Sequence, residues 1–224
     1  MIPSSATGGA AGAAVTIPPH GLEGLLGLPR APGGVILFAH GSGSSRFSPR
    51  NTYVARALQD AGFATLLFDL LRADEQDDRA NVFDIALLSE RLEQAIAWVA
   101  ADKRTRGLAV GLFGASTGAA AALVAAARRG DVVRAVVSRG GRPDLAGAAL
   151  ARVRAPTLLI VGGADSQVLD LNRAALAMIT AEARLEVVPG ATHLFEEPGT
   201  LDGVIAAASA WFRCHLRAVA EAPR

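Results

Sequence analysis

A serine flanked by glycines lies at the centre of a G-x-S-x-G string, with Ser116 between positions 114 and 118. The string lies where the apolar segment 108–115 meets the Ala-rich helical segment 117–129. A sharp strand-to-helix turn of this kind holds the serine hydroxyl above the sheet, and the glycines carry no side chain that would clash. Glycine is common here, at 24 of 224 residues, so the string would also fit a simple packing turn. Its place between a strand and a helix favours a nucleophilic serine.

A nucleophilic serine needs a base, and the chain has four histidines. His193 follows the last apolar segment, so in a parallel sheet it lies at the same edge as Ser116. His20 precedes the parallel segments and His215 falls within the closing helix. His40 ends an apolar segment, where hydrogen bonds to its own loop are the favoured role. We therefore expect His193 to be the base, with an exposed loop histidine as the alternative.

The base in turn needs a carboxylate that orients it. Asp165 follows the apolar segment 156–162 and belongs at the same edge of the sheet. Asp is also a favoured helix cap, so Asp165 could instead cap the next helix. Asp170 is the weaker candidate because it falls inside that helix. The order of serine, aspartate and histidine along the chain matches the order of the α/β-hydrolase triad.

A second glycine-rich loop, at positions 40–43, follows the first long apolar segment. In folds with this order of elements, such a loop supplies an oxyanion donor. We expect the backbone N–H of Ser42 to serve, with Gly43 as the alternative, alongside the backbone N–H of Thr117. Gly41 and Gly43 are expected to border the substrate.

The elements that must position these residues alternate along the chain. Near-continuous apolar segments separated by helical ones indicate a mostly parallel sheet with helices on both faces. Residues 15–17 and 22–26 are expected to form an opening strand pair. Further strands are expected at 35–40, 63–70, 108–115, 132–138, 156–162 and 184–188. Helices are expected at 49–61 (capped by Ser48), 82–101, 117–129, 144–151, 168–179 and 200–219. Residues 1–14 are expected to form a flexible tail, and residues 15–224 a single domain.

Composition limits the classes of function. Hydrophobic residues make up 51% of the 224 and charged residues 19%, which excludes a disordered chain. A net charge of +1 implies no strong attraction to nucleic acid or membrane. Cys214 is the single cysteine, so no intramolecular disulfide and no cysteine-rich metal site can form. The start lacks the pattern of a secretory signal, and the expected location is cytoplasmic.

These loops together resemble the α/β-hydrolase superfamily, and more narrowly its small, lidless dienelactone-hydrolase-like members. The likeness rests on positions 39–43, 114–118, 161–165 and 190–193. It implies an α/β-hydrolase fold without a large lid domain, and a mechanism that uses no metal and no cofactor. Dienelactone hydrolases are known for a cysteine nucleophile, whereas this chain has Ser116. Cys214 lies in the closing helix, so ordinary ester chemistry is favoured.

The expected activity is hydrolysis of small or moderately sized carboxylic esters. About 18 residues separate the segments at 138 and 157, too few for a lid, so the site is expected to be open. Arg139 or Arg142 could hold a substrate carboxylate, or both could be solvated loop residues. An acyltransferase with the same triad and a non-catalytic binding protein on this scaffold are the alternatives. The physiological substrate and the oligomeric state stay open.

Overall fold

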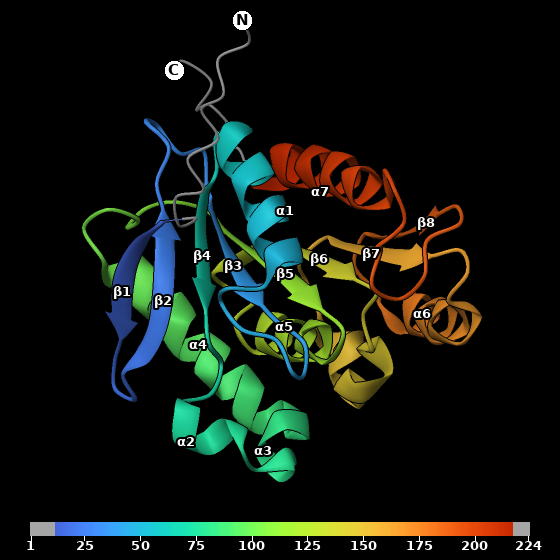
Figure 1. Cartoon of the computed structure of the whole chain (residues 1–224), viewed down its shortest axis with the longest axis horizontal. Coiled ribbons are helices and arrows are strands. Elements are labelled where there is room, and N and C mark those ends of the chain that lie inside the picture. Colours follow the sequence, from blue (N-terminus) through green and yellow to red (C-terminus); the bar gives the residue numbers. More distant parts are fainter. Residues whose placement is uncertain (1–11, 217–224) are drawn as a thin grey trace, which may run out of the picture.

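A single mixed sheet forms the centre of the computed structural model, which describes residues 12–216 (Figure 1). In these residues eight strands lie in the order β1-β2-β4-β3-β5-β6-β7-β8. The antiparallel pairs are β1 with β2 and β2 with β4, and every other neighbouring pair is parallel. The strands are β1 (Ala13–Ile17), β2 (Leu22–Gly27), β3 (Val35–Ala39), β4 (Ala64–Phe68), β5 (Val110–Ala115), β6 (Val133–Arg139), β7 (Thr157–Gly162) and β8 (Ala183–Val188).

Helices cover both faces of this sheet, as the sequence predicts (Figure 1). On one side α1 and α7 lie together, and on the other lie α4, α5, α6 and the 3₁₀ segment η1. The helical elements are α1 (Pro49–Asp60), α2 (Ala73–Gln76), α3 (Arg79–Phe83), α4 (Ile85–Ala101), α5 (Thr117–Arg128), η1 (Pro143–Arg152), α6 (Ser166–Met178) and α7 (Thr200–Leu216). Between β6 and β7 the chain forms only η1, so no lid domain is inserted there. The α/β-hydrolase architecture is confirmed.

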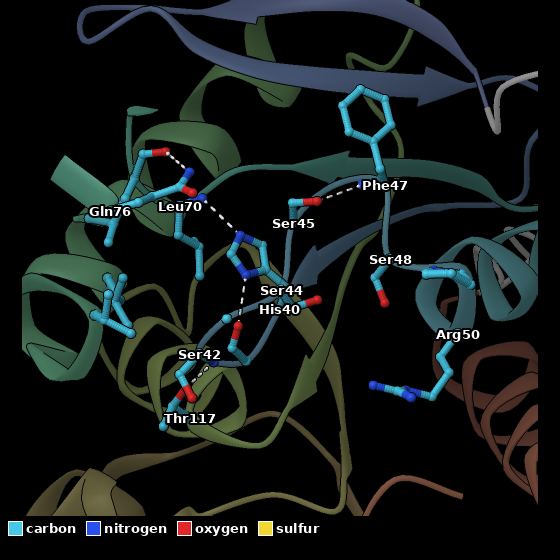
Figure 2. A pocket seen from close by; sticks show the side chains of 16 residues that line it. His40, Ser42, Ser44, Ser45, Phe47, Ser48, Arg50, Leu70, Gln76 and Thr117 are labelled. Carbon is cyan, nitrogen blue, oxygen red and sulfur yellow. Dashed lines mark hydrogen bonds between the residues drawn. The ribbon is translucent and has the colours of Figure 1, made fainter. Parts of the chain in front are cut away.

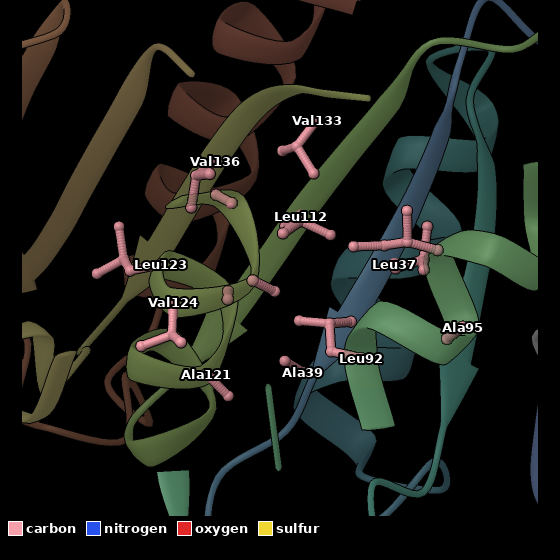
Figure 3. Close-up of a cluster of buried hydrophobic side chains, with 14 of the residues drawn as sticks. Leu37, Ala39, Leu92, Ala95, Leu112, Ala121, Leu123, Val124, Val133 and Val136 are labelled. Atoms are coloured by element: carbon pink, nitrogen blue, oxygen red, sulfur yellow. The ribbon is translucent and has the colours of Figure 1, made fainter. Parts of the chain in front are cut away.

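The central strands bury both of their faces. Along β3, Leu37 points toward the α4 and α5 side, while Phe38 points toward the α1 and α7 side. Both side chains are buried, because successive side chains of a strand point to opposite faces and both faces here are covered. Figure 3 shows Leu37 of β3 and Leu112 of β5 near Leu92 of α4. The two apolar layers hold the strand ends, and therefore the loops that follow them, in fixed positions.

Small side chains let α5 lie close to the sheet. Its residues 117–126 are all buried, and seven of these ten are alanine or glycine. Alanine has the highest intrinsic helix propensity and adds little width to the helix. A central helix made of such residues can follow directly from β5 and still fit between the sheet and η1. This close fit bears on the turn at Ser116.

The predicted helix 82–101 begins later than expected. α3 ends at Phe83, and α4 starts only at Ile85. Asp84 between them has an extended backbone, and its carboxylate accepts a hydrogen bond from the N–H of Leu87 at 3.0 Å. Helical spacing of apolar residues continues across this break, which is why periodicity alone missed it. The polar residues 72–79, which precede the predicted helix, form α2 and the start of α3.

The expected tail boundary at residue 14 is also corrected. Ala13 and Ala14 belong to β1, where Ala13 pairs with Leu26 and Ala14 with Leu25. Two alanines carry no period-2 pattern of their own, and the pairing partner decides their structure. Predicted tail residues 1–11 and predicted helix residues 217–219 lie outside the described part of the chain. Within 12–216, none of the helices has the length and apolar character needed to cross a bilayer.

The capping role of Asp84 gives a stability prediction. Asp84→Ala removes the acceptor for the Leu87 N–H at the start of α4, and an N-cap of this kind contributes about 1 kcal/mol. The free energy of unfolding from urea titration should fall by about that amount. Asp84→Ser restores an acceptor and should recover most of the loss. An unchanged free energy for Asp84→Ala would show that α4 does not depend on this cap.

Candidate active site

The backbone turns sharply at Ser116, between the end of β5 and the start of α5. Ser116 has φ 50° and ψ −122°, one of two non-glycine residues with positive φ in the described chain. Such a conformation costs on the order of 1–3 kcal/mol and persists only where neighbouring structure enforces it. The Ser116 N–H donates to the Arg139 carbonyl at 3.3 Å, and the Ser116 carbonyl accepts from the Arg142 N–H at 3.1 Å. The loop after β6 therefore holds the turn.

Glycines around the turn allow backbones to approach closely. A side chain at Gly118 would overlap the carbonyl oxygens of Ala39 and His40, and one at Gly114 would overlap the backbone of Ala119. A Cβ at Gly41 would lie 2.9 Å from the Ser116 Cβ. The expectation that a side chain at Gly114 or Gly118 would clash is correct, and the clash is with neighbouring backbone. The same contacts bring the β3 loop against the serine.

Asp165 and His193 are joined by a hydrogen bond. The Asp165 Oδ2 lies 2.7 Å from the His193 Nδ1. A carboxylate only accepts, so the Nδ1 of a neutral ring carries the proton and Nε2 is left as a basic nitrogen. Asp165 is the N-cap residue of α6, but its side chain makes no capping bond, so its carboxylate is used by His193 instead. Asp170, the other candidate, is exposed and pairs with Arg173 at 2.9 Å.

The loop after β6 also brings His193 beside the serine turn. Gly140 follows Arg139, whose carbonyl accepts from Ser116, and a Cβ at Gly140 would lie 3.6 Å from the His193 Nδ1. Residues from the ends of β5, β6, β7 and β8 thus meet at one edge of the sheet. Among the described residues, no hydrogen bond joins the Ser116 hydroxyl to His193. Catalytic hydrogen bonds often tighten only when substrate binds.

The loop after β3 is already hydrogen-bonded to the helix that starts at Thr117. The Ser42 N–H donates to the Thr117 Oγ1 at 3.0 Å. The Thr117 N–H has no partner within residues 12–216, as expected for the first turn of a helix. Gly43 has φ 68° and open space beside it. Of the two expected oxyanion donors, the N–H of the buried Thr117 therefore has no partner in the described chain, and the Ser42 N–H is occupied by a side-chain hydroxyl.

His40 holds this loop in place, as the sequence interpretation favours. Its Nδ1 lies 3.0 Å from the Gly41 carbonyl, and its Nε2 lies 3.3 Å from the Leu70 N–H. A carbonyl requires a proton on Nδ1, and an N–H requires a lone pair on Nε2, so both bonds fit only the neutral ring. Burial lowers the pKa of His40 below its ordinary value, although the Gly41 bond and Asp69 act in the opposite direction. The ring is a support for the loop.

A cavity of about 510 Å³ opens beside the same loop (Figure 2). Thr117 and Ser42 line one side, and Arg50 at the start of α1 lines another. Ser116, Asp165 and His193 do not line it, but Thr117, the next residue after Ser116, and Gly41, which lies against the Ser116 side chain, do. The other lining residues are His40, Gly41, Gly43, Ser44, Ser45, Phe47, Ser48, Pro49, Leu70, Leu71, Gln76, Val82 and Leu88. Gly41 and Gly43 thus line this cavity, and their contact with substrate stays a prediction.

The two arginine candidates after β6 differ in their surroundings. Arg142 pairs with Asp144 at 2.7 and 2.8 Å, and this bond lowers the pKa of the Asp144 carboxyl. Arg139 is buried and contacts Asn51 and the ring of Phe195 instead. Arg50 was missed by the sequence reasoning. The signal was available, since Arg50 follows the helix start predicted directly after the oxyanion loop.

Comparison with known proteins places this arrangement in a family. The model of the dienelactone hydrolase family matches residues 22–216. The crystal structure of a dienelactone hydrolase from Anabaena variabilis is 54% identical with a TM-score of 0.88, and the match covers 92% of this chain and 97% of that chain. A lidless α/β serine hydrolase from Xanthomonas campestris has a TM-score of 0.75 at 24% identity, over 92% of this chain and 96% of that one, and shows the fold alone.

A longer relative carries a different name. A Mycobacterium tuberculosis protein with the provisional name of a phosphoribosyl transferase is 61% identical over 198 residues. That match covers 88% of this chain but only 45% of the relative, so the chain spans less than half the length of that protein. The family model and the Anabaena variabilis structure, in contrast, match nearly the whole described chain. On that evidence the chain belongs to the dienelactone hydrolase family.

Proposed function

We propose that this protein is a serine hydrolase that cleaves carboxylic esters, with Ser116 as nucleophile, His193 as base and Asp165 as the orienting acid. The observation that carries the proposal is the hydrogen bond of 2.7 Å between Asp165 and His193 beside the strained turn at Ser116. Strain at a single serine between a strand and a helix, next to a histidine with a fixed tautomer, is typical of acyl transfer. Membership of a hydrolase family supports the same reaction class.

The reaction proceeds in two steps. The Nε2 of His193 takes the hydroxyl proton as Ser116 attacks the ester carbonyl, and Asp165 stabilises the charged ring that forms. The tetrahedral intermediate collapses as His193 protonates the leaving alcohol. Water, deprotonated by the same nitrogen, then releases the acid from the acyl-enzyme. No metal or organic cofactor takes part in these steps.

The oxyanion is held by the backbone N–H groups of Thr117 and Ser42. The Ser42 N–H is bonded to the Thr117 Oγ1 at 3.0 Å. The Thr117 hydroxyl oxygen accepts the hydrogen bond that the Ser42 N–H would otherwise donate to the ester oxygen. Binding therefore requires the Thr117 side chain to rotate or the N–H to be shared. A neutral hydrogen bond contributes about 0.5–1.5 kcal/mol, so its displacement costs a modest part of the binding energy.

The phosphoribosyl transferase name of the longer relative describes a protein of which this chain matches 45%. The site described above contains a serine, a histidine and an aspartate arranged for acyl transfer, so we assign ester hydrolysis to this chain. An acyltransferase would use the same three residues with an alcohol or amine in place of water. The His193 side chain is 38% exposed, so water can reach the acyl-enzyme, and we assign water as the acceptor.

Replacement of the nucleophile tests the proposal directly. Ser116→Ala should leave the fold intact and reduce the hydrolysis of 4-nitrophenyl acetate by at least ~10³-fold, because the covalent step is lost. Labelling by a fluorophosphonate should disappear with the activity. Ser166→Ala, at an exposed serine next to Asp165, should keep both. Retention of most activity by a folded Ser116→Ala protein would refute the assignment.

The acid has a matched control in the same helix region. Asp165→Asn preserves shape but lets His193 adopt the wrong tautomer, so kcat should fall by ~10³- to 10⁴-fold. Asp170→Asn removes only an exposed ion pair with Arg173 and should stay within about twofold of the parent. Steady-state kinetics on one activated ester gives both values. A reversed ranking of the two variants would move the role to Asp170.

The occupied oxyanion donor gives a prediction of opposite sign. Thr117→Ala removes the hydroxyl that competes for the Ser42 N–H, so kcat/KM should rise by roughly 2- to 10-fold, the equivalent of one neutral hydrogen bond. Thr117→Ser keeps the hydroxyl and should behave like the parent. A tenfold fall for Thr117→Ala would instead mean that the hydroxyl itself donates to the oxyanion.

A further inference from the structure

Arg139 is a buried cation without an anion. The residue is 7% exposed at the end of β6. Its Nη2 makes one long hydrogen bond, 3.4 Å, to the amide oxygen of Asn51, and its guanidinium lies 5.8 Å from the centre of the Phe195 ring. Its Nε is buried and has no hydrogen-bond partner. No carboxylate of the described residues pairs with it.

A second positive charge, on Arg50, makes the burial of the Arg139 guanidinium less favourable. Arg50, from the first turn of α1, lies close enough that it adds to the effect of burial, and together they lower the pKa of Arg139 to about 10. The Nε of Arg50 is likewise buried without a partner, while its Nη1 pairs with the exposed Glu196 at 3.0 Å. Buried charges in proteins are normally paired, because removal from water is otherwise uncompensated.

The two arginines lie next to the reacting groups. Arg139 pairs with Ala115 across β5 and β6, and its carbonyl accepts the Ser116 N–H. Arg50 lines the cavity beside the oxyanion loop, and Figure 2 shows its side chain extending from the start of α1. Arg139 does not line that cavity, but its guanidinium lies over the ring of Phe195, two residues after His193. A group that reaches both guanidiniums would therefore lie close to an ester carbonyl at Ser116.

We propose that Arg139 and Arg50 form a subsite for an anionic group, a carboxylate or a phosphate, carried by the ester substrate. The inference deepens the proposed function and rests on it. A guanidinium presents a planar fork of donors that matches two oxygens of either group. The unpartnered Nε atoms of both residues are donors that such a group can satisfy. Arg142, on the same loop, already has its carboxylate in Asp144 and takes no part.

Binding is tested first, without turnover. Ser116→Ala protein is titrated by calorimetry with succinate, with inorganic phosphate and with neutral succinamide. Succinate, phosphate or both should bind, succinamide should not, and the anion that binds more tightly identifies the group. Adding Arg139→Gln should weaken anion binding at least tenfold, whereas adding Arg142→Gln should not change it. Equal binding by the Arg139→Gln protein, or no binding of either anion, would overturn the proposal.

Kinetics then connects the subsite to catalysis. The parent enzyme should prefer mono-4-nitrophenyl succinate over the neutral 4-nitrophenyl butyrate by at least tenfold in kcat/KM. Arg139→Gln should abolish that ratio, and Arg139→Lys, which keeps the charge but loses the fork, should restore part of it. An equal ratio in the parent and in Arg139→Gln would overturn the subsite.

The two experiments fail independently. Absence of ester turnover with anion binding intact would refute the proposed function and leave the anion site. Turnover with no anion binding would do the reverse. Loss of folding in Arg139→Gln is detected by circular dichroism, and Arg50→Gln then supplies a second test, since the loss of one fork from the pair should also weaken anion binding.

Discussion

The strained backbone of Ser116 can form only if several other segments of the chain pack closely around it. A positive φ at a serine persists only if neighbouring structure leaves no relaxed alternative. Here the carbonyls that follow β3 press against Gly118, and the loop after β6 bonds the serine on both of its backbone groups. α5 can start at this point because its buried residues are small. Holding one residue in a strained conformation thus requires small residues, glycine or alanine, at several positions. It also requires two loops that are distant in sequence to lie against the turn.

Several polar side chains near the turn make hydrogen bonds that fix their orientation. Asp165 could have capped α6, yet its carboxylate bonds His193. The two ring nitrogens of His40 are both used by its own loop and the neighbouring β4 loop, which keeps that ring out of chemistry. Against this pattern, the Arg139 guanidinium has no carboxylate partner among the described residues, and its Nε, like that of Arg50, makes no hydrogen bond. We attribute this unmet charge to the anionic group of the substrate that we propose for the Arg139 and Arg50 subsite.

Much of this organisation follows from local sequence patterns. The alternation of apolar and helical segments predicts the parallel sheet, and the loops that follow strand ends predict where Ser116, Asp165 and His193 lie. The predicted start of the helix at residue 82 was wrong, because the apolar spacing continues across Asp84. The capping bond of Asp84 interrupts the helix, and a periodic pattern of apolar residues gives no sign of it. The partner of Ser42 could not be predicted, because it depends on the contact of two loops 75 residues apart. The same holds for Arg139 and Arg50, whose proximity arises from tertiary packing.

One wall of the cavity is only lightly attached to the rest of the fold. Gln76 of α2 and Val82 of α3 line the cavity, yet neither short helix buries a residue. Val82 packs against the apolar core but is only partly buried, and polar contacts such as the pair of Glu75 with Arg91, at 2.8 Å, hold the rest of this wall. Most mutations lower the free energy of unfolding, and the large losses come mainly from buried positions. We therefore expect substitutions in this wall to lower it only slightly. Substitutions there are therefore expected to change the shape of the cavity with less effect on the fold than substitutions around the turn at Ser116.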